Sequence, residues 1–291
     1  MKNSKEIKAL LHLLDDPDRE IFNSVSEKIL FYGKDIIPNL ESFWEQTTDN
    51  TVQERIENLI HKVNFSDVFQ GLTQWFNIEK PNLLDGAILL ARYKYPDLEE
   101  DQIRKTIKNI YQSCWLELNN YLTPLEQVTI INSIFYSMYK FKGFDLDDNK
   151  PAHFYMNEVV DSHFGNNYSL GILYQVLCEM LDIPVFAVQL PHQFLLAYYD
   201  TRYDITKKHH SPFAGIQFYI DPNSGMIYTQ NDVDVYLKKY GFTLENDAIY
   251  PLSNKEILFC EIEALIQVYN QLEEEDKAIE LQSILDLKNN Q

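Results

Sequence analysis

Hydrophobic residues in the first quarter of the chain recur at intervals of three and four. That spacing predicts amphipathic helices in residues 5–14, 15–33, 35–46, 50–63 and 66–78. The second of these begins at an Asp-Pro pair and ends at Gly33, residues that typically start and stop a helix. The polar connections between these helices are short, so neighbouring helices are expected to be antiparallel.

Helical spacing continues through the middle of the chain. Further helices are predicted in residues 83–93, 95–112, 122–141 and 168–181, with a polar loop at 142–151. Two of them begin with a residue pair suited to a capping box, in which each side chain bonds the other residue's backbone N–H group. These pairs are Asp97 with Glu100 and Thr123 with Glu126, the second pair followed by Pro124 at the first helical position.

After Pro184 the pattern changes from helical to short alternating runs. Residues 185–190, 193–199 and 216–220 are rich in β-branched and aromatic side chains and are predicted to be strands. A Pro-Asn-Ser-Gly turn then leads into another short strand, while residues 200–215 form a loop long enough to have a function. Helices followed by antiparallel strands predict an α+β fold that is mostly helical, with a small antiparallel sheet.

The tail opens with a third capping-box pair, Ser253 and Glu256, and predicts two helices, in residues 254–273 and 276–288. This pair of helices resembles one tetratricopeptide-like hairpin, and it must pack on the core because a single hairpin cannot bury both faces. The helices of the first region resemble a short HEAT-like solenoid. The sequence therefore predicts three regions: residues 1–78, 79–250 and 251–291.

Composition narrows the function classes. The chain has 291 residues, 45% of them hydrophobic, and a formal net charge of -19 with no offsetting Lys/Arg cluster. The negative electrostatic potential of a chain with this charge repels phosphate backbones and anionic membrane surfaces. Neither nucleic acid nor membrane is therefore an expected partner. No apolar run approaches the roughly 20 residues of a membrane span. The three cysteines are far apart and odd in number, which favours the reducing cytoplasm.

Three residues stand at positions that could form a catalytic triad. Asn167 lies at a predicted helix start, His192 on a neighbouring strand and Asp221 at the end of the next strand. A cysteine at a helix N-terminus, a histidine that takes its proton and an aspartate that orients the imidazole would use this order. Asparagine, however, has no ionisable nucleophile near neutral pH. Nor do Ser169, Tyr168 or Cys178 have the helical spacing or chemistry to replace it.

Residues 82–227 resemble the SirB-type branch of the transglutaminase-like superfamily. The most specific pieces are the run from Leu190 to Leu195 and the Asp-Pro-Asn-x-Gly turn from Asp221 to Gly225. The resemblance implies a papain-like core with a helical N-terminal region and often a tetratricopeptide-like tail. It also implies that His192 and Asp221 match the family's histidine and aspartate. Asn167 falls where active members hold cysteine, and many SirB-type members also lack that cysteine, commonly having proline there.

Each of these residues also has a simpler structural interpretation. His192 could be an ordinary histidine at a strand end, Asp221 initiates a turn, and Asn167 suits a helix cap, which is its expected physical role. The adjacent His209 and His210 are expected in a solvated loop, and no Cys, Asp or Glu spacing completes a metal site with them. His153 and His163 could join a site only through the fold. No metal and no cofactor are therefore expected.

The sequence favours a transglutaminase-like module that binds a protein or peptide segment without cleaving it. A hydrolase or acyl transferase with a rearranged nucleophile is the alternative, and it requires a Ser, Tyr or Cys side chain within reach of the His192 ring. A third possibility is a helical scaffold with no pocket at His192 and an exposed apolar stripe on residues 4–78.

Overall fold

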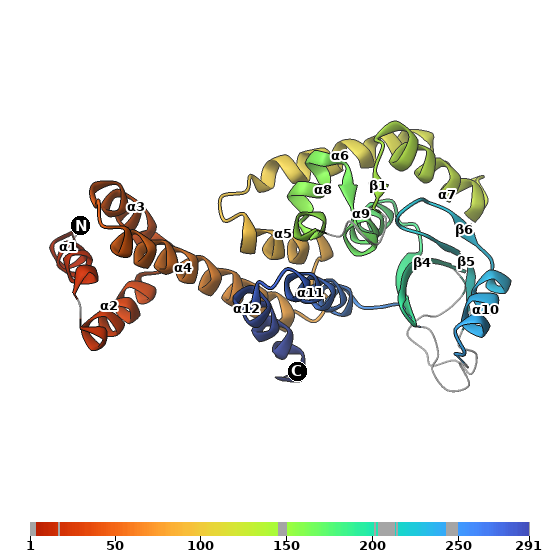
Figure 1. Cartoon of the computed structure of the whole chain (residues 1–291). Helices are drawn as coiled ribbons and strands as arrows, with labels where there is room; N and C mark the ends of the chain where they lie inside the picture. Colours follow the sequence, from red (N-terminus) through yellow and green to blue (C-terminus); the bar gives the residue numbers. More distant parts are fainter. Residues whose placement is uncertain are drawn as a thin grey trace. The chain divides into compact units, whose positions relative to one another are not determined.

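The computed structural model describes residues 4–16, 18–144, 150–200, 202, 213, 215–242 and 250–290. These fall into two compact units (Figure 1). The first unit comprises Met1–Trp75 and Arg92–Pro96, and the second comprises Phe76–Ala91 and Asp97–Gln291. The proposed division into a HEAT-like region, a core and a tetratricopeptide-like hairpin stays a prediction.

The first unit is built from the helices predicted near the N-terminus. They are α1 (Ser4–His12), α2 (Arg19–Tyr32), α3 (Ile37–Gln46) and most of α4 (Asn50–Asn77), with short 3-10 turns at Leu13–Asp15 and Gly33–Ile36. Asp18 caps α2 by accepting the Glu20 N–H, and Gly33 ends it with a φ of 60°. Apolar residues spaced along these helices form a separate small core, with Ile29, Leu40 and Ile56 fully buried.

The prediction of two helices in residues 50–63 and 66–78 is wrong, because α4 runs unbroken from Asn50 to Asn77. No glycine or proline lies between the two predicted segments, and Val63 and Val68 are buried on either side of the expected break. Burial of apolar side chains on both sides of the expected break stabilises a continuous helix. The polar residues at the break do not interrupt it.

The second unit holds the remaining helices. They are α5 (Leu83–Lys94), whose residues from Arg92 on are assigned to the first unit, α6 (Glu100–Glu117), α7 (Pro124–Asn132), α8 (Met156–Ser162), α9 (Asn167–Met180), α10 (Gln230–Lys239), α11 (Asn254–Gln271) and α12 (Glu275–Leu285). A π-helix (Ser133–Met138) continues α7, and 3-10 helices occupy Pro151–Phe154 and Asp286–Asn290. None of the described helices combines the length and the hydrophobicity that a bilayer crossing would need.

Two of the three predicted capping boxes are confirmed and one is wrong. Thr123 with Glu126 caps α7, and Ser253 with Glu256 caps α11, each by reciprocal bonds. Asp97 and Glu100 do not form a box, because α6 begins only at Glu100 and the Glu100 carboxylate instead accepts from Arg104 one turn later. An ion pair within the helix has replaced the expected cap.

A four-stranded antiparallel sheet follows the order β3-β4-β5-β6, which confirms the predicted strands and the α+β, mostly helical fold. The strands are β3 (Val185–Leu190), β4 (Gln193–Tyr199), β5 (Ile216–Ile220) and β6 (Ile227–Tyr228). A separate two-residue parallel pairing joins β1 (Lys142–Gly143) to β2 (Phe164–Gly165).

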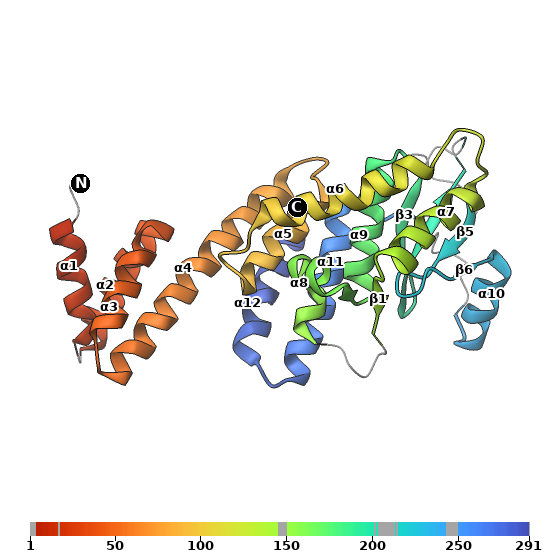
Figure 2. The same cartoon turned by 90° about the horizontal axis from the view of Figure 1, so that it is seen from above.

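Helix α9 lies at the centre of the second unit (Figures 1 and 2). Every residue from 169 to 178 is buried, so this helix is enclosed by the core around its whole circumference. Side chains alternate along β4: Phe194 and Leu196 belong to the core around α9, whereas Leu195 and Ala197 pack with α10 on the other face. The sheet is thus covered by a helix on each side, and the N-terminal end of α9 is held next to the β3–β4 turn.

The C-terminal helices pack on this core, as predicted. Ile257 of α11 belongs to the same buried cluster as α9. The buried Gln175 side chain on α9 donates to Asn254 Oδ1 at 3.3 Å and accepts the Ala187 N–H at 2.7 Å. One amide therefore joins α9, β3 and the start of α11, which fixes the hairpin beside the central helix.

Candidate functional site

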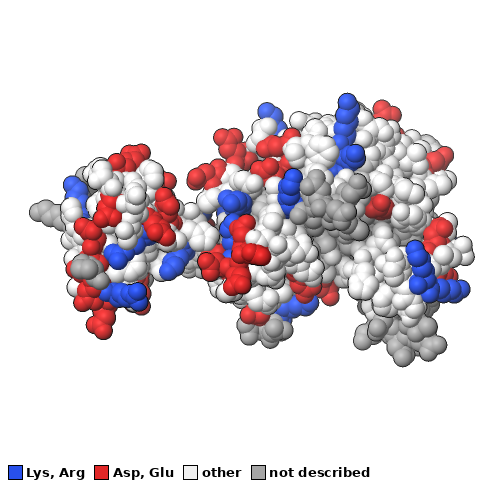
Figure 3. Space-filling view, in the orientation of Figure 1, with Lys and Arg blue, Asp and Glu red and all other residues white. Residues whose placement is uncertain are grey.

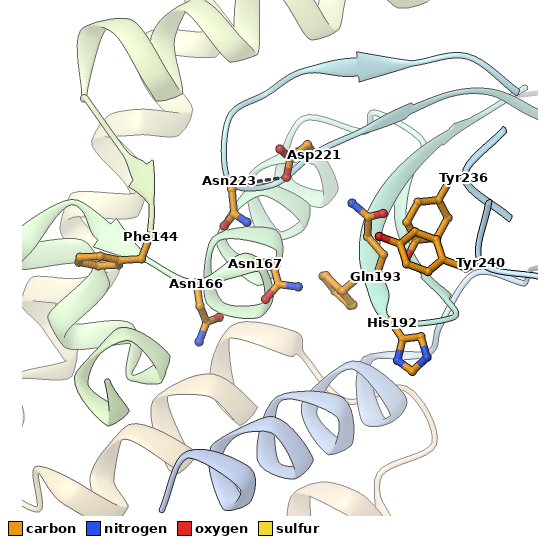
Figure 4. A pocket seen from close by; sticks show the side chains of 10 residues that line it. Phe144, Asn166, Asn167, His192, Gln193, Asp221, Asn223, Tyr236 and Tyr240 are labelled. Carbon is orange, nitrogen blue, oxygen red and sulfur yellow. Dashed lines mark hydrogen bonds between the residues drawn. The ribbon is translucent and has the colours of Figure 1, made fainter. Parts of the chain in front are cut away.

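A cleft of about 440 Å³ opens in the second unit where α9, the β3–β4 turn, the end of β5 and α10 come together (Figure 4). All three residues singled out in the sequence, Asn167, His192 and Asp221, line it. The full lining is Phe144, Asn166, Asn167, His192, Gln193, Phe194, Asp221, Asn223, Tyr236 and Tyr240. The structure thus brings the three predicted positions to one cavity, although it does not bond them to one another.

Asn167 is the first residue of α9, and it is not the helix cap. The cap is Asn166, whose Oδ1 accepts the N–H groups of Tyr168 and Ser169, both at 2.9 Å. Ser169 Oγ in turn accepts the Asn166 N–H at 3.1 Å, which completes a capping box. The expectation that Asn167 caps the helix is therefore wrong by one residue. The Asn167 side chain has no capping role.

His192 lies in the β3–β4 turn rather than on a strand. Leu190 and Gln193 close this hairpin, which leaves Pro191 and His192 as its two-residue loop. His192 has a φ of 59°, the left-handed value that a type II turn requires after its proline. Its exposed imidazole packs on Phe242, with 5.7 Å between ring centroids. The Tyr236 hydroxyl donates to Pro191 O at 2.8 Å, so α10 holds this turn in place.

The Asp221 carboxylate is occupied by its own turn. Its Oδ1 accepts the Asn223 N–H at 2.9 Å, drawn as a dashed line in Figure 4, and its Oδ2 accepts the Ser224 hydroxyl at 2.6 Å. Among the described residues, no hydrogen bond joins Asp221 to His192. The turn-forming role expected of Asp221 operates, while the imidazole-orienting role is not formed in this arrangement.

The turn from Asp221 to Gly225 is anchored on α7 and the π-helix that follows it. Asn132 Nδ2 donates to Gly225 O at 2.8 Å, and the Tyr136 hydroxyl donates to Pro222 O at 2.9 Å. Tyr174 of α9 donates to Asn132 Oδ1 at 2.9 Å, which links the turn to the central helix. Burial raises the pKa of the Tyr136 phenol well above its usual value, so the hydroxyl stays a donor at any ordinary pH.

Among the described residues, no hydroxyl or thiol forms a hydrogen bond with the His192 ring, and the Tyr236 hydroxyl in the cleft donates to Pro191 O instead. Ser169 Oγ is buried and donates to His153 O at 2.7 Å. Burial raises the pKa of the Cys178 thiol well above its usual value, and burial with nearby Cys260 raises the pKa of Tyr168 to about 12. A thiol or phenol held in its protonated form is a poor nucleophile, so none of these groups is an activated nucleophile.

Four carboxamide side chains and several aromatic rings line the cleft, and most of them were not predicted from the sequence. The amides are Asn166, Asn167, Gln193 and Asn223, and the rings come from Phe144, Phe194, Tyr236 and Tyr240. Two of these positions had local signals: the Asn-x-x-Ser spacing of Asn166 and Ser169 marks a helix cap, and Gln193 directly follows the turn. Phe194 lies within the run from Leu190 to Leu195, whereas Phe144, Tyr236 and Tyr240 come from other segments and had no such signal.

The histidines considered for metal binding are placed as follows. His153 is buried and stacks on Phe144 with 3.5 Å between ring centroids, while His163 packs on Phe141. His209 and His210 lie outside the described residues. Within the parts of the chain that the structure describes, no three His, Cys, Asp or Glu residues form a group that could hold a metal ion. The expectation that the protein uses no metal and no cofactor stays a prediction.

A thiol placed at position 167 tests whether His192 can act on the head of α9. In the Asn167→Cys variant the positive end of the helix should lower the thiol pKa. Because the His192 ring packs on Phe242, the pH profile of alkylation by iodoacetamide should be unchanged in Asn167→Cys/His192→Ala. Native Cys260 should react slowly, since burial raises its pKa to about 11. A profile midpoint that moves up by about one pH unit without His192 would contradict this geometry.

Comparison with known proteins supports the superfamily expected from the sequence, while the SirB-type branch stays a prediction. The family model of the transglutaminase-like superfamily matches residues 101–259, more than half of the chain. Two curated proteins of Xylella fastidiosa, strains Temecula1 and 9a5c, are each named UPF0162 protein and are each 26% identical over 115 residues. Each of these matches covers 39% of this chain and 41% of the relative, so the chain spans about two fifths of the length of the curated relatives it matches. No solved structure matched the chain. The matched residues contain α9, the whole antiparallel sheet and the cleft, and the chain belongs to the transglutaminase-like superfamily.

Proposed function

We propose that the second unit is a non-catalytic transglutaminase-like module of the SirB type that binds a protein or peptide segment in its cleft. One observation carries the proposal: the head of α9, which lines the cleft, bears the carboxamide of Asn167 and no nucleophile. The packing of His192 on Phe242 and the bonding of Asp221 within its own turn support it further. A cleft arranged in this way can bind an amide or peptide without attacking it.

The chemistry of the lining suits a polypeptide. Each of the four carboxamides can both donate and accept, as a peptide group does. Figure 4 shows Phe144 at one end of the cleft and Tyr236 and Tyr240 at the other, with the amides between them. Aromatic rings provide contact area for apolar side chains, and tyrosine is frequent at protein interfaces. An extended segment could thus bond the amides through its main chain and place side chains at both ends.

The alternatives have less support. The rearranged-nucleophile enzyme requires a hydroxyl or thiol beside His192, and no described residue supplies a hydrogen bond of that kind. The helical scaffold required no pocket at His192, whereas the cleft is lined by His192 itself. The free thiols of Cys114, Cys178 and Cys260 support placing the proposed binding in a reducing compartment such as the cytoplasm. Acidic side chains spread over the face of each unit in Figure 3 support partners other than nucleic acid or anionic membranes.

Panning a library of random peptides on the immobilised full chain tests this function. We expect a family of binders whose affinity falls about tenfold in Tyr240→Ala, because truncating an aromatic side chain at an interface commonly costs that much. Tyr121→Ala is the matched control, since Tyr121 is 95% exposed and does not line the cleft. Binders that are equally sensitive to both substitutions, or to neither, would place binding outside the cleft and contradict the proposal.

Catalysis is tested on the same peptides. Incubation with the purified protein should leave them intact and without cross-links, as judged by mass spectrometry. Cleavage or transfer by the natural chain that is lost in Asn167→Ala or His192→Ala would show an enzyme, and the non-catalytic proposal would then be wrong.

A further inference from the structure

A second hollow of the second unit lies away from the cleft, between α6 and the helix that α7 forms with the π-helix after it. This α6–α7 groove has a volume of about 390 Å³ and shares no lining residue with the cleft. Figure 2 shows α6 and α7 in front, with no other described helix or strand drawn over them. The groove is thus on the outside of the unit.

The walls of the groove are apolar and open to solvent. Ile130, Ile134 and Met138 recur every four residues and all line it, so they form one ridge along their helix. Leu116 lines it from α6. Leu116 is 73% exposed and Met138 is 64% exposed. Large apolar side chains that line a concave surface and still contact water are typical of a place where another molecule packs.

The shape of the groove suits a helix better than an extended segment. All of its lining residues belong to helices, so the groove offers a partner no strand edge for main-chain pairing. A helix bonds its own backbone and can place a row of side chains between two neighbouring helices. Ser113 and Ser133 line the groove among the larger residues, and their small side chains leave room for such a row.

The charges at the groove favour a basic partner. Glu117 is the one charged residue of the lining. It lies in the last turn of α6, which has no basic residue, and no described group donates to the backbone carbonyls of Trp115, Leu116 or Glu117. The carboxylate and the negative end of the helix dipole therefore both favour a cation. The net charge of -19 attracts a basic partner at longer range.

A second copy of the chain is a poorer occupant. It carries the same net charge of -19 and would be repelled. A symmetric contact through the groove would also bring two Glu117 side chains together, and the lining has no basic residue to separate them.

We propose that the α6–α7 groove binds an amphipathic helix of a basic partner protein. Large apolar side chains of that helix pack on the ridge of Ile130, Ile134 and Met138, and a Lys or Arg beside them meets Glu117 and the end of α6. The π-helix supports this assignment, because such helices are rare and occur frequently at functional sites. The surface is separate from the cleft, so the inference goes beyond the proposed function.

Selection from a display library of helical peptides on the natural full chain tests the proposal. We expect binders that carry Lys or Arg beside their apolar residues and that bind at least about tenfold more weakly to Ser133→Phe, whose ring fills the groove. Ser137→Phe is the matched control, since Ser137 is exposed on the same π-helix and does not line the groove. No binders, binders unaffected by Ser133→Phe, or equal losses in both variants would overturn the proposal.

Two other variants check the location of binding. Leu116→Ala removes a side chain that is mostly exposed, so the core stays intact, and it should also weaken the binders about tenfold. It keeps the proposal testable if Ser133→Phe does not fold. Tyr240→Ala, in the cleft, should leave these binders unaffected. A loss in Tyr240→Ala without one in Leu116→Ala would place the helix in the cleft, overturning this inference while supporting the proposed function.

Glu117→Lys tests the charge. It should weaken the basic binders about fivefold, the effect of one exposed ion pair. Glu54→Lys is the matched control, because Glu54 is exposed on α4 and makes the same change in net charge far from the groove in sequence. Equal effects of the two substitutions would show that only the net charge matters, and the pairing with Glu117 would be wrong.

Analytical ultracentrifugation of the natural chain separates the proposed partner from a second copy. We expect a monomer at the concentrations used for peptide binding. A dimer that is lost in Ser133→Phe and retained in Ser137→Phe would assign the groove to a second copy of the chain and overturn the proposal.

Discussion

The Glu261→Met variant is expected to be more stable than the natural chain by about 2–4 kcal/mol at pH 7. Glu261 lies on the buried face of α11, is 1% exposed, and neither carboxylate oxygen has a hydrogen-bond partner. Burial raises its pKa well above the usual 4.5. Methionine has a similar size and no polar group, so it removes the cost of this burial without leaving a cavity.

The extra stability of Glu261→Met over the natural chain should increase as pH rises. Above the ordinary pKa of 4.5 the unfolded chain loses the Glu261 proton while the folded chain keeps it. The folded state then binds more protons, so stability falls as pH rises, by about 1.4 kcal/mol per pH unit from this residue. The fall ends when the folded carboxyl ionises. Urea unfolding at pH 5, 6, 7 and 8, followed by circular dichroism, should show this decline in the natural chain and a flatter profile in Glu261→Met.

Two further variants test whether the buried Glu261 carboxyl causes the pH dependence of stability. Glu261→Gln keeps the shape and cannot ionise, so its profile should also be flatter. Glu263→Gln is the surface control on the same helix: Glu263 is 48% exposed and lies 3.8 Å from Lys288, a pair of the kind that contributes little. Its profile should run parallel to that of the natural chain. Parallel profiles for all four proteins would show that Glu261 is not a buried proton-binding group.

Gly225→Ala is expected to destabilise the second unit by about 2–4 kcal/mol. Gly225 has a φ of 73°, which strains any residue with a Cβ, and an added Cβ would lie 2.5 Å from Tyr136 Cε2. The Tyr136 ring cannot easily move away, because its hydroxyl is bonded to Pro222 O and the ring packs against Phe135 and Tyr174. The variant should therefore shift the turn that carries Asp221 and Asn223, and should weaken peptide binding as well.

Gly241→Ala separates backbone strain from collision. Gly241 has the same φ of 73°, and nothing lies within 4 Å of an added Cβ. It should cost only the strain of a left-handed alanine, about 1 kcal/mol. Urea unfolding of both variants gives the difference. Equal losses would show that the contact with Tyr136 has no energetic weight, and the anchoring of the turn by the π-helix would then need revision.

Local sequence signals predicted the elements well and the side-chain geometry of the site less well. The strands, the helix that became α9 and two capping boxes depend on residues within a few positions of one another, and all are confirmed. The third box failed because Arg104, four residues beyond Glu100, competes for the same carboxylate. The break expected inside α4 failed because buried valines on both sides favour a continuous helix.

The candidate site shows a different limit. The sequence brought Asn167, His192 and Asp221 to one cleft, but it could not show where their side chains point. The orientation of His192 follows from a left-handed turn and from Phe242, fifty residues away in the chain. Two adjacent asparagines gave no means of choosing the cap except the position of Ser169. The ring contact of His192 depends on a distant segment, whereas the choice of cap depends on a bond within one helical turn.

The capping of α9 by Asn166 also has a consequence for the history of the family. Since the capping bonds of the helix come from Asn166 and Ser169, and its packing from residues 169–178, a change of side chain at position 167 leaves both in place. A lineage could exchange a reactive residue there for an inert one in a single step, with no compensating change elsewhere. Loss of chemistry and retention of shape would then be independent events, and an ancestral enzyme could become a receptor without passing through an unstable intermediate.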